Sequence, residues 1–336
     1  MYRTIILLMI LLIAAGAAHG DENTRQIDPA SDQSAAVRVA VTPWPGSASI
    51  FVAEEKGYFK EEGLRVTLQS LESGHLSLNA LLSGNADLAT MGDTPIARAV
   101  LRGRDLRVLA TIAKTSRAIG IVARKDRGIS GPEDLSGKTV GVVPGTTAQV
   151  FLYAYLATSY IDPEKVRITH IPPDKVETLL MTGEVDAVST WAPHSDRLME
   201  KLGDQAVLLQ DPSIYTMTWN LAAMQSFVEK HPSRIRKFLR AVIRANRYMS
   251  EATDQARAAV SARISSETAT ISEEEWQSFT FTAELDQSLI LNLEEQARWM
   301  IERGYAQAET PPNFLNILHT VCLKAVKPES VQIPGK

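Results

Sequence analysis

The stretch LLSGNADL at residues 81–88 is echoed by LLMTGEVDA at residues 179–187. Each copy starts with apolar residues, breaks at a glycine, and ends on an aspartate that opens a new apolar run. Glycine commonly ends a helix, and a short apolar run after it is typical of a buried strand. The repeat therefore predicts two copies of a unit in which a helix is followed by a strand.

An apolar strand and a loop rich in glycine and proline lie upstream of each copy. VRVAV at 37–41 runs into TPWPGS at 42–47, and TVGVV at 139–143 runs into PGTT at 144–147. Each loop leads into a stretch that we expect to be helical. Short strands alternating with helices predict an α/β fold with a parallel sheet and helices on both faces. Two similar halves in one chain indicate two lobes with a ligand held between them.

From residue 226 the pattern becomes helical. Residues 232–251 carry apolar side chains at helical spacing, and further helices are expected at 252–264, 272–279 and 293–303. We expect this all-helical tail to pack on the first lobe. The chain would then cross between the lobes near 115–121 and again near 216–222. The predicted first lobe comprises residues 37–118 and 222–336, and the predicted second lobe comprises residues 119–221.

The first 20 residues have the pattern of a secretory signal peptide. Arg3 precedes an apolar run at 5–18, and small residues before Asp21 offer a cleavage site near Gly20. The apolar run is shorter than the ~20 residues that a membrane span needs, which favours cleavage over anchoring. Residues 21–36 are polar and lack periodicity, so we interpret them as a flexible leader. The protein is thus expected to be exported.

Composition and motifs exclude several function classes. The net charge of −4 and the lack of a basic stripe argue against a nucleic-acid partner. A single cysteine, Cys322, excludes an intramolecular disulfide, and we expect it to be a buried residue of the last helix. Residues 131–139 have the wrong glycine spacing for a phosphate-binding loop, and no nucleophile elbow or metal-ligand spacing occurs. We therefore predict no catalytic residue, metal or cofactor.

The two loops that precede helices are candidate ligand-binding elements. A helix N-terminus presents unpaired N–H groups and the positive end of a dipole, so it can hold an anion. Glycines in both loops would let a ligand approach the backbone closely. The residues of interest are Gly46 and Ser47 in the first loop, Gly145, Thr146, Thr147 and Gln149 at the second, and Thr94 at a further helix start. The alternative is that these are ordinary turn and capping residues.

Tryptophans occupy similar places in the two halves. Trp44 lies in the loop after the first strand, and Trp191 follows the strand expected at 186–190. A tryptophan on a loop is either part of the core or a wall of a pocket, and we favour the pocket for both. Trp219, near the second expected crossing, is a weaker candidate. We interpret Asp87 and Asp186, which open the repeated strands, as structural.

Several stretches together resemble a known family. Residues 53–64, AEEKGYFKEEGL, follow the Pro-Trp loop, and DLSGKTVGV at 134–142 and WAP at 191–193 occur further on. Residues 81–87, 183–187, 229–238 and 323–331 extend the match over nearly the whole mature chain. This combination resembles solute-binding proteins of the nitrate, sulfonate and taurine class of ABC importers, the NMT1/THI5-like proteins.

The resemblance implies a monomeric periplasmic binding protein of the type II kind, with two crossover strands between its lobes. The ligand would be a small organic anion, delivered to membrane permease subunits that work with a cytoplasmic ATPase. The residues that would line the cleft are Trp44, Gly46, Ser47, Thr94, Gly145, Thr146, Thr147 and Trp191. Arg117, beside the first crossing, is the one nearby cation that we single out.

Three other functions remain open at this point. The tryptophans could bind a flat heterocycle such as a pyrimidine or a thiamine precursor. The protein could report its ligand to a signalling partner instead of a permease. A pyrimidine synthase shares the resemblance, but that enzyme carries a cysteine-rich motif and is cytosolic, whereas this chain has one cysteine and an export signal.

Overall fold

The computed structural model describes residues 36–264 and 270–333. The predicted signal peptide and nearly all of the predicted leader lie outside these residues. Within the described part of the chain, no helix is both long and apolar enough to cross a membrane. The described elements form two separate sheets, each with its own helices, as the repeat predicted.

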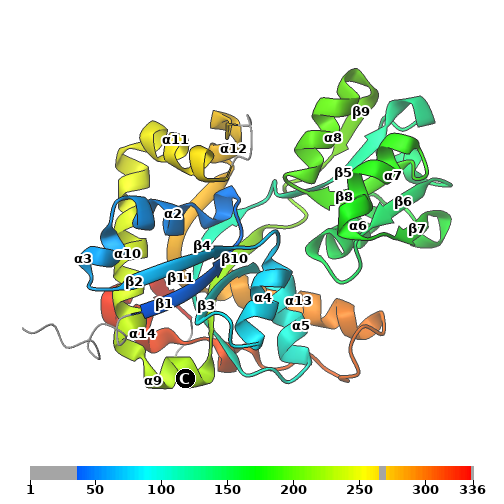
Figure 1. Ribbon diagram of the computed structural model, residues 1–336. Coiled ribbons are helices and arrows are strands. Elements are labelled where there is room, and N and C mark those ends of the chain that lie inside the picture. Colours follow the sequence, from blue (N-terminus) through cyan, green and yellow to red (C-terminus); the bar gives the residue numbers. More distant parts are fainter. Residues whose placement is uncertain (1–35, 265–269, 334–336) are drawn as a thin grey trace, which may run out of the picture. The chain divides into compact units, whose positions relative to one another are not determined.

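The first sheet has seven strands in the order β12-β11-β4-β10-β3-β1-β2. Its strands are β1 (Ala36–Val41), β2 (Arg65–Ser70), β3 (Leu88–Gly92), β4 (Leu106–Thr115), β10 (Met217–Met224), β11 (Phe279–Asp286) and β12 (Val331–Gln332). The helices of its first half are α2 (Ala48–Glu55), α3 (Tyr58–Glu61), α4 (Gly74–Leu82) and α5 (Asp93–Leu101). The later helices are α9 (Gln225–Lys230), α10 (Pro232–Glu251), α11 (Thr253–Ile264), α12 (Glu273–Gln277), α13 (Gln287–Glu302) and α14 (Thr320–Val326). Figure 1 shows α2 and α10 on one face of this sheet and α4, α5 and α13 on the other.

The second sheet has five strands in the order β7-β6-β8-β5-β9. Its strands are β5 (Ile119–Arg124), β6 (Thr139–Val142), β7 (Arg167–His170), β8 (Ala187–Trp191) and β9 (Ala206–Leu209). Three helices accompany them, α6 (Thr147–Thr158), α7 (Val176–Thr182) and α8 (His194–Leu202), as Figure 1 shows.

Both sheets are mixed, and the expectation of purely parallel sheets is wrong. β1, β2 and β3 are parallel, whereas β10 runs antiparallel to both β3 and β4. In the other sheet β6, β7 and β8 are parallel, whereas β5 runs antiparallel to β8 and β9. The reversed strands β5 and β10 are those that directly follow a passage between the sheets. The repeat describes the strands within each half and contains no information about these connecting strands.

The expectation of an all-helical tail is also wrong, because β11 pairs antiparallel with β4. Residues 279–285 alternate between apolar and polar side chains, and the buried positions include Ala283 and Leu285. This period of two is typical of a strand. The capping signal at Ser272 lies just before this strand and favours a helix there. That signal holds, since the Ser272 hydroxyl accepts a hydrogen bond from the Glu275 N–H at 3.0 Å, but the helix ends at Gln277.

The chain passes from the first sheet to the second through residues 116–118 and returns through residues 210–216. The side chain of Gln210 ties the two passages together. Its Nε2 donates to the carbonyl oxygens of Arg117 at 2.9 Å and Ile119 at 2.7 Å. The two crossings are therefore held side by side at the point where the sheets are joined.

The repeated aspartates have the same structural role in both halves. The Asp87 carboxylate accepts a hydrogen bond from the Arg38 N–H at 2.8 Å, and the Asp186 carboxylate accepts one from the Thr139 N–H at 2.8 Å. Each aspartate thus fastens the third strand of its half to the first. This geometry confirms the structural interpretation of the repeat. Cys322 is fully buried in α14, as expected.

Candidate functional site

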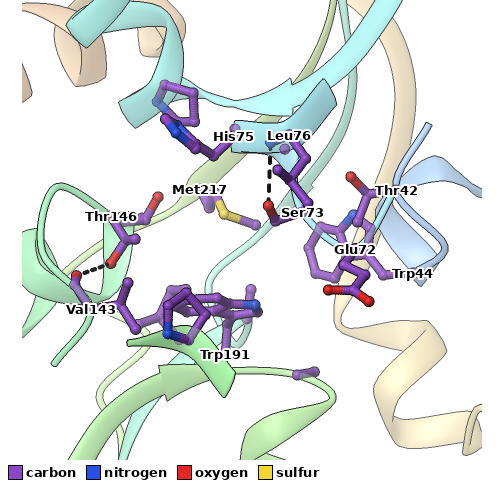
Figure 2. Close-up of a pocket in the computed structure, with 18 of the residues that line it drawn as sticks. Thr42, Trp44, Glu72, Ser73, His75, Leu76, Val143, Thr146, Trp191 and Met217 are labelled. Atoms are coloured by element: carbon purple, nitrogen blue, oxygen red, sulfur yellow. Dashed lines mark hydrogen bonds between the residues drawn. The ribbon is translucent and has the colours of Figure 1, made fainter. Parts of the chain in front are cut away.

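A cleft of about 430 Å³ is lined by loops from both sheets. Its walls come from the ends of β1, β2 and β3 in the first sheet and of β6 and β8 in the second. These are the carboxyl ends of parallel strands, where open α/β sheets bind ligands. The segments that line it are Thr42–Trp44, Glu72–Leu76, Val143–Thr147, Trp191–His194 and parts of α5, β5 and β10. Figure 2 shows a close-up of the cleft.

The cleft brings together six of the residues singled out from the sequence. They are Trp44, Gly145, Thr146, Thr147, Trp191 and Trp219. Four others, Gly46, Ser47, Thr94 and Gln149, are not among the lining residues. Arg117 lines a smaller hollow beside the cleft, where it forms an ion pair with Glu274 at 2.8 Å.

Trp44 and Trp219 form an apolar wall on the side of the first sheet. Their ring centroids lie 4.9 Å apart in an edge-to-face arrangement. Ser47 is fully buried behind them, and its hydroxyl oxygen accepts a hydrogen bond from Trp219 Nε1 at 3.1 Å. Gly46 leaves room for the Trp44 ring, because a Cβ at that position would lie 2.4 Å from it. Gly46 and Ser47 therefore hold the tryptophans that face the cleft.

The loop before α6 forms the opposing wall. Gly145 adopts a φ of +71°, and its N–H donates to Gln149 Oε1 at 2.7 Å. Gln149 Nε2 in turn donates to the hydroxyl of Tyr305, which follows α13, at 2.8 Å. The hydroxyls of Thr147 and Thr94 lie 2.8 Å apart, so the N-termini of α6 and α5 meet directly. Gln149 and Thr94 thus shape and connect the loops of the cleft.

Arg98 of α5 also lines the cleft, and it is not among the residues predicted from the sequence. Its guanidinium crosses to the second wall, because a Cβ at Gly145 would lie 2.5 Å from Arg98 Nη1. Burial, followed by the charge of Arg102, lowers the pKa of Arg98. Across residues 36–264 and 270–333 the structure pairs this guanidinium with no carboxylate. Arg98 lies four residues after Thr94, which was expected to start a helix, and residues at this spacing share one face of a helix. This spacing is the signal that could have identified Arg98.

Two histidines line the cleft as well. Burial lowers the pKa of His75, and the positive charges of Arg98 and Arg102 lower it further. His194 packs edge-on against Trp191, with ring centroids 5.7 Å apart. His194 Nδ1 lies 3.1 Å from a carboxylate oxygen of Glu177, which fixes the orientation of the ring. Among the described residues, no cluster of three His, Cys, Asp or Glu side chains could hold a metal ion.

We expect Glu177→Gln to destabilise the protein by about 2 kcal/mol at pH 7. Burial alone would raise the pKa of Glu177, but hydrogen bonds from Lys201, His194 and Arg197 lower it from 4.5 to about 2. The expected loss of stability is smaller than the full shift of the Glu177 pKa implies, because Lys201 and Arg197 are about half exposed. A depressed folded-state pKa stabilises the protein above pH 4.5, and this stabilisation is lost as the pH falls towards 2.

Urea unfolding at pH 7 and pH 3 measures this effect. The difference in the free energy of unfolding between Glu177→Gln and the wild type should be less than half as large at pH 3 as at pH 7. Glu164→Gln, at an exposed position near β7, is the matched control and should change stability little. An equal loss at both pH values would contradict the assignment of the stabilisation to an ionised Glu177.

The chain is similar over much of its length to known proteins. A family model described as NMT1/THI5 like matches residues 44–256. The taurine-binding periplasmic protein of Escherichia coli K12 is 29% identical over 220 residues, which cover 63% of this chain and 67% of that protein. A putative aliphatic sulfonates-binding protein of Bacillus subtilis 168 is 24% identical over 257 residues, or 75% of each chain.

A solved structure has the same fold. The alkanesulfonate-binding protein SsuA from Xanthomonas axonopodis pv. citri, bound to MOPS, superposes with a TM-score of 0.70 at 17% identity. The superposition covers 85% of this chain and 98% of that one. The likeness supports the two-lobed α/β architecture that the repeat predicted.

Proposed function

The chain belongs to the NMT1/THI5-like family, and from this premise we propose that it is the extracytoplasmic substrate-binding subunit of an ABC importer. It captures a small organic anion in the cleft and delivers it to a membrane permease that is driven by a cytoplasmic ATPase. The relatives described above are binding proteins, and this chain is a binding protein rather than an enzyme. A monomer located in the periplasm fits this role.

The observation that carries the proposal is the unpaired guanidinium of Arg98 inside the cleft. A cation without a carboxylate partner in a partly buried position favours an anionic ligand. The N-terminus of α6 adds unpaired N–H groups and a positive dipole end on the same wall. A sulfonate group is such an anion. The two relatives described above are a taurine-binding protein and a putative aliphatic sulfonates-binding protein.

In this proposal the residues have two roles. Arg98, Gly145, Thr146 and Thr147 hold the anionic group, and Trp44, Trp191 and Trp219 enclose the remainder of the ligand. Gly46, Ser47, Thr94 and Gln149 support these groups from behind. Each lobe is built on one of the two sheets, and the second lobe ends at the return passage 210–216 rather than at the expected residue 221, because β10 belongs to the first sheet. Ligand binding closes the two lobes.

A thermal-shift screen of the mature protein tests the ligand class. Alkanesulfonates, taurine, nitrate, bicarbonate and pyrimidines are each added at concentrations up to 10 mM. A ligand at 100 times its dissociation constant should stabilise the protein by roughly 2.7 kcal/mol and raise Tm by about 5 °C. We expect stabilisation by sulfonates that Trp191→Ala weakens. Stabilisation by none of the anions would contradict the proposal.

A flat heterocycle is the second candidate ligand. Trp44, Trp191 and Trp219 all line the cleft, and aromatic walls can stack on a planar ring. Stabilisation by pyrimidines alone, retained in Arg98→Gln, would favour this candidate. Such a result would keep the transport role but replace the anion site with a stacking site.

A further inference from the structure

The cleft contains an unpaired carboxylate in addition to the unpaired guanidinium. Glu72 follows β2 and lines the cleft with an exposed side chain. In the described part of the chain, the structure gives this carboxylate no hydrogen bond and no ion pair. The Leu71 N–H donates to the Val41 carbonyl oxygen at 2.9 Å, which places Glu72 beside the loop that carries Thr42 and Trp44. Both charges of the cleft are therefore available to a ligand.

The two charges lie at different ends of the cleft. Figure 2 shows Glu72 on the same side as Trp44 and Thr42, with Thr146 on the opposite side. Trp191 and Met217 lie between these sides in the view. Arg98 belongs to the Thr146 side, because its guanidinium lies against Gly145. An apolar stretch thus separates a cationic end from an acidic end.

A carboxylate in the cleft works against a ligand that carries only negative charge. Two like charges in one cleft repel, and the repulsion raises the dissociation constant. A ligand with a positive group at that end gains an attractive pairing instead. An aromatic face such as that of Trp44 also attracts a cation that lies within ~6 Å of the ring.

We propose that the ligand is a zwitterion whose anionic group binds at Arg98 and the N-terminus of α6 and whose cationic group binds at Glu72. The apolar spacer of the ligand lies along Trp191 and Met217. This inference rests on the proposed function as an anion-binding subunit, and it narrows the ligand class to amino-substituted organic anions. Glu72 is then the residue that selects the zwitterion over the simple anion.

Isothermal titration calorimetry with matched probe pairs tests the inference. Taurine is compared with propane-1-sulfonate, and 3-aminopropane-1-sulfonate with butane-1-sulfonate, so that each pair differs only in an ammonium in place of a methyl group. We expect the wild type to bind the amino member of at least one pair 10-fold or more tightly. Glu72→Gln should reduce that preference to less than 3-fold by weakening the binding of the amino member alone.

The control variant is Glu164→Gln, which removes an exposed carboxylate that does not line the cleft and should keep the preference. Equal binding of both members of each pair by the wild type would overturn the inference and leave the proposed function standing. If Glu72→Gln lost affinity equally for both members of a pair, that result would also overturn the inference. Binding of no sulfonate by the wild type would overturn the proposed function itself.

Discussion

Arg98→Gln should weaken the binding of an organic anion by about 100-fold and leave the fold intact. Hydrogen bonds to a charged group are worth ~1.5–3 kcal/mol, and 1.4 kcal/mol corresponds to a tenfold change in affinity. Arg98 has no carboxylate partner among the described residues, so its replacement leaves no buried acid without a counter-charge. The Tm of the ligand-free variant should therefore stay within about 2 °C of the wild type.

Two further variants separate three contributions to anion affinity: the charge of Arg98, the planar shape of its guanidinium, and the field of positive charges near the cleft. Arg98→Lys keeps the charge but loses the planar fork of the guanidinium, so we expect an intermediate loss of affinity. Arg102→Gln removes a charge one helical turn further along, from an exposed residue that does not line the cleft, and should change affinity less than fivefold. Calorimetric titration with the strongest ligand of the thermal-shift screen measures all three. Equal losses in Arg98→Gln and Arg102→Gln would show that Arg98 makes no direct contact.

Asp93→Ala should destabilise the protein by about 4 kcal/mol. Asp93 is fully buried at the start of α5. Its carboxylate accepts hydrogen bonds from the Thr218 N–H and hydroxyl, both at 3.2 Å, and from Gln296 Nε2 at 2.7 Å. Asn292 Nδ2, at 3.1 Å, and the Tyr215 hydroxyl also donate to it. Removing the carboxylate leaves the buried Thr218 N–H and the Tyr215 hydroxyl without this acceptor, whereas Asn292 and Gln296 keep bonds to the Thr216 carbonyl oxygen and the Tyr215 hydroxyl.

The Asp93 cluster also fastens the return passage between the sheets. Tyr215 lies in residues 210–216, whereas Gln296 belongs to α13. Burial, followed by the charge of Asp93, raises the pKa of Tyr215 well above 10, so its hydroxyl keeps its proton and continues to donate. Asp93→Ala should therefore loosen this passage as well as lower global stability.

Urea unfolding followed by circular dichroism measures the global effect, and hydrogen exchange across residues 210–224 measures the local one. Asp254→Ala is the matched control, because its carboxylate is 83% exposed and pairs with Arg257 on the same helix. The control substitution should lower the free energy of unfolding by less than ~1 kcal/mol. A loss below 1 kcal/mol in Asp93→Ala, or unchanged exchange across the return passage, would contradict this account.

Local sequence patterns determined the framework of this protein. The repeated helix, glycine and aspartate units predicted two α/β halves, because the apolar period and the glycine stop act over a few residues. The loops of the cleft were predictable for the same reason, since they follow strands and precede helices. The bounds of α10 agree with the expected range 232–251, and α6 begins directly after the second loop, where a helix was expected.

Only the tertiary structure decided which side chains meet in the cleft. Arg98 reaches Gly145 because α5 of one sheet packs against a loop of the other, and these residues lie 47 positions apart. Arg117 was the expected cation, but it pairs with Glu274, far along the chain. Gln149 connects Gly145 of the cleft wall to the distant Tyr305. The strand β11, which follows the long helices in sequence, pairs with β4 of the first sheet. Such contacts depend on how distant segments pack, and no pattern confined to a few neighbouring residues contains that information.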